Sequence, residues 1–174
     1  MLMSVDKVKM FITTGLSDEA LTVKMSALES AIRKYTNNDF QNRKYRFNCP
    51  IIDGKLYLKT PYLQIGDSIQ ITTSLHNDGL YSVIDLNSSF VEVNKILFDE
   101  ENVLLIKIEY PEDVQLGAIN MLKWDIENRD KVGIQSESIS RHSVSYFNMD
   151  GENSIIGYPK SLIGFLTPYK KARF

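Results

Sequence analysis

Cysteine, histidine and tryptophan are scarce in this chain of 174 residues, which contains one, two and one of them. Because Cys49 is the only cysteine, an internal disulfide is excluded. The two histidines, His76 and His142, have no metal-ligand spacing to each other or to Cys49, so a zinc site is not indicated. We therefore expect no metal and no cofactor.

Long apolar runs and an excess of basic charge are also missing. No segment approaches the about 20 apolar residues that span a bilayer, and Asp6 and Lys7 come too early for a secretory signal. The formal net charge is -2, whereas a sequence-independent duplex binder carries a basic excess that neutralises phosphates. We expect no membrane partner, synthesis in the cytoplasm and no strong grip on DNA.

Catalytic motifs are absent as well. The sequence has no phosphate-binding loop, no paired-glycine dinucleotide turn and no nucleophile elbow. Ser140, His142 and Ser143 have the residue types of a hydrolase, but neighbours in an extended strand point to opposite faces and form no triad. We predict that the chain is not an enzyme.

The N-terminal part has helical periodicity. A short helix is expected from Ser4 to Ile12, and a second one starts at Ser17, which can cap it. An apolar stripe at spacings of three and four follows, made of Leu21, Met25, Leu28, Ile32 and Tyr35.

From about Arg43 to Tyr110 the apolar period changes to two, which predicts several short antiparallel strands. Asp53-Gly54 between two apolar runs is a strong hairpin signal, because tight primed turns need positive φ. A second turn is expected at 77–79, and the acidic residues 99–102 are expected to be a solvated turn between two strands.

Helical periodicity returns at Pro111, followed by Glu112 and Asp113 in a favourable first turn, and ends near Gly133. The expected fold class is α+β: a small helical core of two N-terminal helices and one long helix, an inserted antiparallel β module and an extended C-terminal tail. The expected divisions are residues 1–42 with 111–133 for the core, 43–110 for the module and 134–174 for the tail.

The tail lacks regular patterns but contains the apolar and aromatic residues that disordered segments lack. One extended strand is expected from Ser136 to Tyr146, and a short helix from Ser161 to Leu166. Two interpretations remain open: the tail wraps over its own domain, or it docks on a neighbouring subunit or another protein.

The chain resembles the head–tail connector, or adaptor, proteins of tailed bacteriophages. The resemblance is carried by the Ser17-Asp18-Glu19 helix start, the Pro-Glu-Asp-Val helix at 111, the segment 133–146, and Gly157-Tyr158-Pro159 followed by residues 169–174. It covers most of the chain in layout and is specific in residues in the tail.

This resemblance implies a structural, non-enzymatic subunit of the phage neck. Such subunits form a ring of identical copies under the portal, extend the DNA channel and support a stopper or tail-completion protein. DNA then passes without specific binding, and the protein is located in the virion. The implied portal-binding residues are Tyr169, Lys170, Lys171, Arg173 and Phe174. The expected contacts with other subunits or partners are Ser136, Ser138, Ile139, Arg141, Val144, Tyr146 and Tyr158.

A different function remains open for the β module. Tyr57, Tyr62 and Tyr81 could form a stacking platform for an oligosaccharide or for single-stranded nucleic acid. The simpler interpretation is that these tyrosines pack the module itself, since few basic residues accompany them.

Overall fold

The computed structural model describes residues 2–132, 136–139, 142–145 and 152–172. The chain divides into two compact units. One consists of Met1–Ser4 and Asp39–Tyr110, and the other of Val5–Asn38 and Pro111–Phe174. We call them the barrel unit and the helical unit, and each is described by itself.

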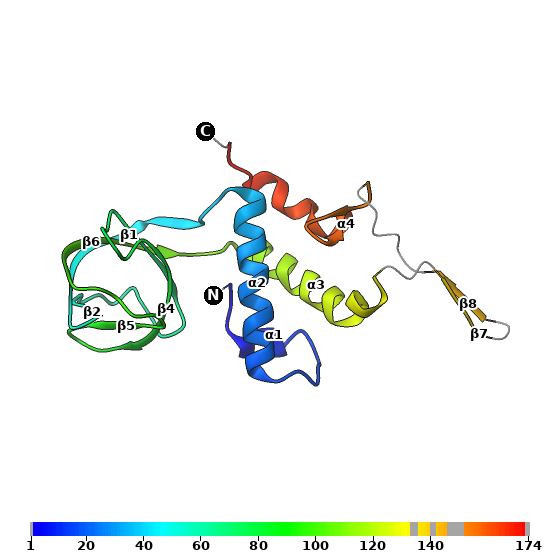
Figure 1. Cartoon of the computed structure of the whole chain (residues 1–174), viewed down its shortest axis with the longest axis horizontal. Coiled ribbons are helices and arrows are strands. Elements are labelled where there is room, and N and C mark those ends of the chain that lie inside the picture. The colour runs from blue at the N-terminus through cyan, green and yellow to red at the C-terminus, as the bar shows by residue number, and fades with distance from the viewer. Residues whose placement is uncertain (1, 133–135, 140–141, 146–151, 173–174) are drawn as a thin grey trace. The chain divides into compact units, whose positions relative to one another are not determined.

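Six antiparallel strands of the barrel unit close into a barrel in the order β1-β2-β5-β4-β3-β6 (Figure 1). The strands are β1 (Gln41–Ile52), β2 (Lys55–Leu56), β3 (Ser68–Thr72), β4 (Gly79–Leu86), β5 (Val91–Val93) and β6 (Glu100–Ile108). Closure comes from the long β1–β6 ladder, which runs from Gln41 opposite Ile108 to Ile51 opposite Glu100. A closed barrel leaves no unpaired sheet edge.

Inward-facing apolar side chains fill this barrel and give it a core of its own. They include Ile51, Leu56, Ile69, Ile71, Tyr81, Val83, Val91 and Leu105. The expected hairpin is confirmed, since Asp53 and Gly54 have φ values of 51° and 70° and connect Ile52 to its partner Lys55. Burial alternates along β5 and over residues 103–105 of β6, which fits the period-two pattern of the sequence, whereas Leu105 and Ile106 are both buried.

The expected acidic turn at residues 99–102 is wrong. β6 begins at Glu100, so Glu100 and Glu101 belong to a strand. The Glu100 carboxylate accepts hydrogen bonds from the Ser74 hydroxyl at 2.5 Å and from the Leu75 amide at 3.1 Å. This carboxylate therefore stabilises the neighbouring β3–β4 loop, a role that its sequence context does not reveal.

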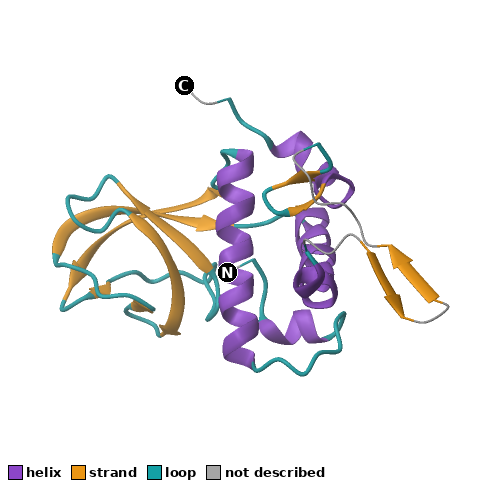
Figure 2. Cartoon of the chain, turned by 45° about the vertical axis from the view of Figure 1, so that its right-hand side comes forward, coloured by secondary structure: helices purple, strands orange, loops and turns teal. Residues whose placement is uncertain are grey.

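The helical unit is built from α2 and α3, with shorter elements around them (Figure 2). Its elements are α1 (Val5–Lys9), α2 (Asp18–Thr36), α3 (Glu112–Asn128), the 3-10 helix η1 (Arg129–Lys131), β9 (Ser154–Ile155), β10 (Tyr158–Pro159), α4 (Lys160–Ile163) and the 3-10 helix η2 (Gly164–Tyr169). The Ser17 hydroxyl accepts a hydrogen bond from the Ala20 amide, which confirms the predicted cap. The first helix is shorter than expected.

The predicted stripe on α2 is buried at Leu21, Met25, Leu28 and Ile32. The fifth expected member, Tyr35, is only half-buried, and Thr36 takes the buried position instead. The Thr36 hydroxyl donates to the Ile32 carbonyl at 2.8 Å, which satisfies this polar group. Within the described residues, no helix combines the length and the apolar character needed to cross a membrane.

The C-terminal part also differs from expectation. Instead of one extended strand, β7 (Ser136–Ile139) and β8 (His142–Ser145) form an antiparallel hairpin, with Ser136 opposite Ser145. Residues 152–172 form a short hairpin and helices that contact α2 and α3. The expected fold class, a small helical core with an inserted β module and an extended tail, is therefore wrong. The β segment closes into a barrel, and the described part of the tail is folded.

Candidate assembly site

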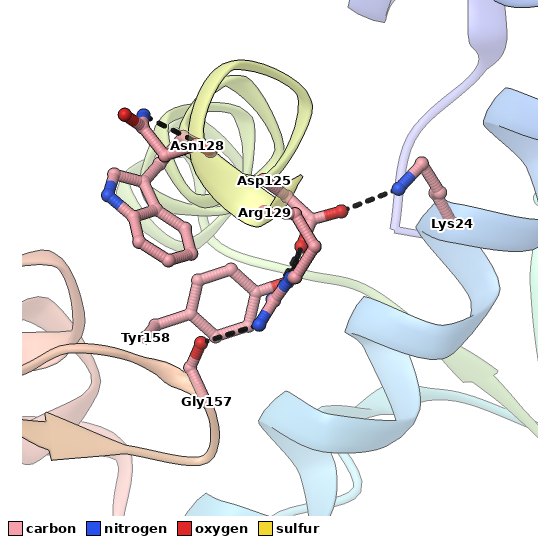
Figure 3. A network of polar contacts seen from close by, with 7 residues as sticks. Lys24, Asp125, Asn128, Arg129, Gly157 and Tyr158 are labelled. Atoms are coloured by element: carbon pink, nitrogen blue, oxygen red, sulfur yellow. Dashed lines mark hydrogen bonds and ion pairs between the residues drawn. The ribbon is translucent and has the colours of Figure 1, made fainter. Parts of the chain in front are cut away.

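One attachment of the C-terminal segment to the helices is centred on a buried carboxylate, Asp125 of α3 (Figure 3). Asp125 is 8% exposed and lies 2.6 Å from Nζ of Lys24 on α2. On its other side it accepts a hydrogen bond from Nε of Arg129 at 2.5 Å. A buried charge needs such partners, so this carboxylate links α2, α3 and the Arg129 guanidinium.

Arg129 connects Asp125 to the C-terminal segment. Its Nη1 donates to the Gly157 carbonyl at 3.0 Å, and its guanidinium lies 4.9 Å from the Tyr158 ring centroid and 5.3 Å from that of Trp124. Figure 3 shows Tyr158 beside Arg129 and Asp125. An arginine that both hydrogen-bonds and stacks is not replaceable by lysine. Arg129 therefore fixes the β9–β10 hairpin on the end of α3.

The surroundings of Asp125 shift its pKa and that of Tyr158. Burial by itself raises the pKa of the Asp125 carboxyl, but hydrogen bonds from Lys24 and Arg129 outweigh burial and hold this pKa below its ordinary value. Burial, with the nearby Asp125 charge, raises the pKa of the Tyr158 hydroxyl. At neutral pH the carboxylate is thus charged and Tyr158 is neutral.

Further along the tail, Phe165 packs directly on α3. A Cβ built at Gly117 would lie 2.3 Å from Cζ of Phe165, closer than any real contact. Ile163 and Leu166, on either side, are 1% and 0% exposed. A side chain at 117 would therefore have to displace the Phe165 ring.

The last described residues are tied to the ends of α2 and α3. The Tyr169 hydroxyl lies 2.7 and 2.8 Å from the two carboxylate oxygens of Asp113, which raises the pKa of Tyr169. The Lys171 amide donates to the Thr36 carbonyl at 2.8 Å, and the Asn38 side-chain amide donates to the Tyr169 carbonyl at 3.1 Å. Residues 154–172 thus wrap over their own unit.

The predicted portal-binding residues differ in their surroundings on the folded C-terminal segment. Tyr169 is half-buried and bound to Asp113, so its hydroxyl is already engaged. Lys170 and Lys171 are exposed, with Nζ of Lys170 4.0 Å from the centroid of the Tyr35 ring. Arg173 and Phe174 lie outside the described residues. What this end presents to a partner is basic charge.

The other predicted contact residues fall in two places. Ser136, Ser138, Ile139 and Val144 belong to the β7–β8 hairpin, whereas Arg141 and Tyr146 lie outside the described residues. Tyr158 is 9% exposed and belongs to the Asp125 network. It therefore positions the tail.

The three tyrosines of the alternative function have different neighbours. Tyr81 is 9% exposed, with its hydroxyl donating to the Asn77 carbonyl, so it belongs to the barrel core. The Tyr57 ring lies 6.3 Å from that of Phe90, and the Tyr62 ring 5.0 Å from that of Tyr45. No ring pair among the three is found.

A cavity of about 340 Å³ lies beside the Asp125 network in the helical unit. Its lining includes Val23, Lys24, Leu28, Leu122, Arg129 and Tyr158.

Among the residues with described structure, no group of three or more side chains that could hold a metal ion occurs. Cys49 is buried in the barrel, which raises its pKa to about 11 and keeps the thiol protonated.

Sequence reasoning missed Asp125 and Arg129, although a signal exists. Asp125 interrupts the apolar face of the third helix, and Arg129 follows it four residues later, the spacing of a helical ion pair. A carboxylate on a core-facing position indicates a buried partner.

No protein-family model matches this chain, and a search among curated proteins gives no match either.

Proposed function

We propose that this chain is a structural subunit of the bacteriophage neck. Copies of it form a ring beneath the portal, extend the DNA channel and support a stopper or tail-completion protein. The observation that carries the proposal is the β7–β8 hairpin, whose two strands pair with each other and with no other strand in the described part of the chain. A two-stranded sheet is marginally stable alone in water, and its open edges favour strand addition by another chain.

The folded tail supports the same role. Because Arg129, Phe165 and Tyr169 hold residues 154–172 on the helices, Lys170 and Lys171 lie at a fixed place on the unit. A charged patch on a fixed base loses less entropy on binding than one on a free tail. We therefore assign the portal contact to the basic charge of this end.

The charge of the chain agrees with a channel subunit. A formal net charge of -2 gives the chain no excess of basic residues to neutralise the phosphates of duplex DNA. DNA is then free to pass during packaging and ejection.

The proposal is tested by binding to the phage's own portal. Wild-type protein is mixed with purified portal rings, and the bound mass is measured by sedimentation velocity, with Lys170→Ala/Lys171→Ala and Ser138→Pro compared alongside. We expect wild type to bind and the lysine variant to bind at least about tenfold more weakly. Proline at 138 should also weaken binding, because it removes a backbone donor from β7. Lys123→Ala, an exposed lysine of α3, is the matched control and should bind like wild type. Absence of wild-type binding contradicts the proposal.

A further inference from the structure

The two ends of the barrel have opposite character. Along the β1–β6 ladder, Arg46 lies opposite Ile106 and Ile51 lies opposite Glu100. These positions are about 16 Å apart along β1, at about 3.3 Å per residue. We call the end with Asp53, residues 74–78 and residues 96–101 the acidic end, and the end with residues 42–46 the basic end.

Large apolar side chains are exposed at the acidic end. Leu75 is 84% exposed, Ile96 88% and Phe98 61%. Ile96 and Phe98 flank the buried Leu97, so both face outward from the same stretch. A cavity of about 430 Å³ lies beside them, lined in part by Ile84, Val93, Ile96 and Leu97. Exposed apolar side chains gathered in this way are typical of an interaction surface.

The loops that carry these side chains are held in place by hydrogen bonds. The buried Asn77 side chain donates to the Phe98 carbonyl at 2.9 Å and accepts from the Phe98 amide at 2.8 Å. The Asn77 side-chain amide also donates to the Glu100 carboxylate at 3.1 Å. This carboxylate accepts further hydrogen bonds from the Ser74 hydroxyl and the Leu75 amide. The apolar surface is therefore preorganised, which lowers the entropy cost of docking.

Carboxylates surround this surface. They are Asp53, Asp78, Asp99, Glu100 and Glu101. Within the described residues, none of the five forms a salt bridge. The acidic end thus presents apolar contact area with five carboxylates around it and one lysine, Lys95, whose Nζ donates to the Leu80 carbonyl.

The basic end carries three exposed basic side chains and an aromatic pair, beside the Glu109 carboxylate that accepts a hydrogen bond from the Asn42 side chain. Between Gln41 and Arg46 the register of β1 shifts, so four residues bulge opposite a single residue of β6. Arg43, Lys44 and Arg46 are exposed there, and in the part of the chain that is described none of them has a salt bridge. Tyr45 stacks on Tyr62 at 5.0 Å, and Nζ of Lys107 donates to the Tyr62 carbonyl.

We propose that the acidic end of one barrel docks on the basic end of the barrel of a second copy. Leu75, Ile96 and Phe98 then pack against Tyr45 and Tyr62 of the next copy, while the carboxylates face Arg43, Lys44 and Arg46. One patch meets a different patch, so the contact is heterologous and propagates into a ring when the rotation closes. This inference rests on the proposed function and names the surface that would join its subunits.

The second copy is favoured as the occupant because the two ends match in both charge and chemistry. Opposite charges steer the encounter of two proteins, and like charges across an interface oppose it. Nucleic acid would suit only the basic end and would leave the exposed apolar side chains of the acidic end in water.

Charge reversal at each end tests the contact. The acidic-end variant is Asp53→Lys/Glu101→Lys, and the basic-end variant is Arg43→Glu/Lys44→Glu. Glu101, Arg43 and Lys44 do not hold the loops, whereas Asp53 forms the β1–β2 turn at a φ of 51°, so the unfolding transition of its variant is compared with that of wild type. We expect each variant alone to lower the assembly of copies on the portal at least about tenfold, as measured by mass photometry. Lys123→Glu/Glu127→Lys on α3 is the matched control and should assemble like wild type.

Compensation separates a broken contact from a misfolded variant. In an equimolar mixture, the lysines at the acidic end of one variant can meet the glutamates at the basic end of the other, and the two unchanged ends can meet as in wild type. The mixture should therefore regain assembly. A chain that carries all four changes should regain assembly too. Failure of both rescues overturns the inference, as does normal assembly by either variant alone.

The nucleic-acid alternative has its own readout. If Arg43→Glu/Lys44→Glu loses binding to a fluorescent oligonucleotide while it assembles normally, the basic end serves nucleic acid and the inference is wrong. If wild-type protein still forms rings on the portal in that case, the proposed function stands and only this inference is wrong. If wild-type protein forms no rings, the proposed function is itself contradicted.

Discussion

The ring of Phe165 lies so close to Gly117 of α3 that a methyl group at 117 would overlap it, at 2.3 Å from Cζ. The contact joins the C-terminal segment to the helix in which Gly117 sits. It explains why a glycine, normally unfavourable inside a helix by about 1 kcal/mol relative to alanine, occupies a buried position.

Gly117→Ala should therefore destabilise the helical unit, against the usual sign of such a change. We expect a loss of about 1–3 kcal/mol in the free energy of unfolding, from overpacking, measured by urea denaturation. In a Phe165→Ala background the clash is absent, so the same change should be neutral or stabilising. Equal effects in both backgrounds would show that Phe165 does not contact Gly117.

Acid should weaken the attachment of the tail through Asp125. The native pKa of this carboxyl is lowered, so its contribution to stability is present above the unfolded pKa of about 3.9 and is lost as pH falls through the native value. Asp125→Asn should be less stable at neutral pH by about 2 kcal/mol, and its stability should fall less between pH 5 and pH 2 (roughly, the range over which paired carboxylates titrate). Parallel pH profiles for the two proteins would contradict this role.

Asn77 should control the opening of the barrel. Asn77→Ala leaves the Phe98 amide and carbonyl without their side-chain partner, at a cost of about 1–3 kcal/mol. The buried thiol of Cys49, with its pKa raised to about 11, reports on opening because it reacts only when exposed. Thiol labelling should be faster in Asn77→Ala, whereas Asn94→Ala, which loses a bond to the exposed Ser82 amide, is the control with a smaller effect. Unchanged labelling in Asn77→Ala would refute the assignment.

Tyr169 should protect the end of the chain from trypsin. Tyr169→Phe removes the contact with Asp113 and loosens the backbone around Lys170 and Lys171, which are trypsin sites. Cleavage there should be faster in this variant and in Asp113→Asn by a similar factor, followed by mass spectrometry. Tyr57→Phe on the barrel is the control. Cleavage at the wild-type rate in both variants of the pair would refute the attachment.

Local features of the fold follow from the sequence, because they depend on neighbouring residues. The cap at Ser17 and the Asp53-Gly54 hairpin are confirmed, and so is the stripe on α2 except for Tyr35. Closure of the barrel is different, since it depends on Gln41 pairing with Ile108 and on Ser68 pairing with the same residue. Period-two alternation shows which side chains face inward, but it does not say which distant strands pair.

The site was predicted less well than the fold elements. The tail was identified as unusual, but its attachment depends on the approach of Phe165 to Gly117 and on Arg129 reaching Gly157, contacts between residues far apart in the sequence. Only the Asp125–Arg129 pair has a local signature. Glu100 was assigned to a solvated turn because its partners Ser74 and Asn77 come from another loop.

The most direct test of the central claim is negative-stain electron microscopy of portal rings incubated with this protein. The account predicts an added layer of density with the rotational symmetry of a ring on one face of the portal, traversed by an open channel. Portal rings that look the same with and without the protein, at concentrations where the protein is folded, would contradict it.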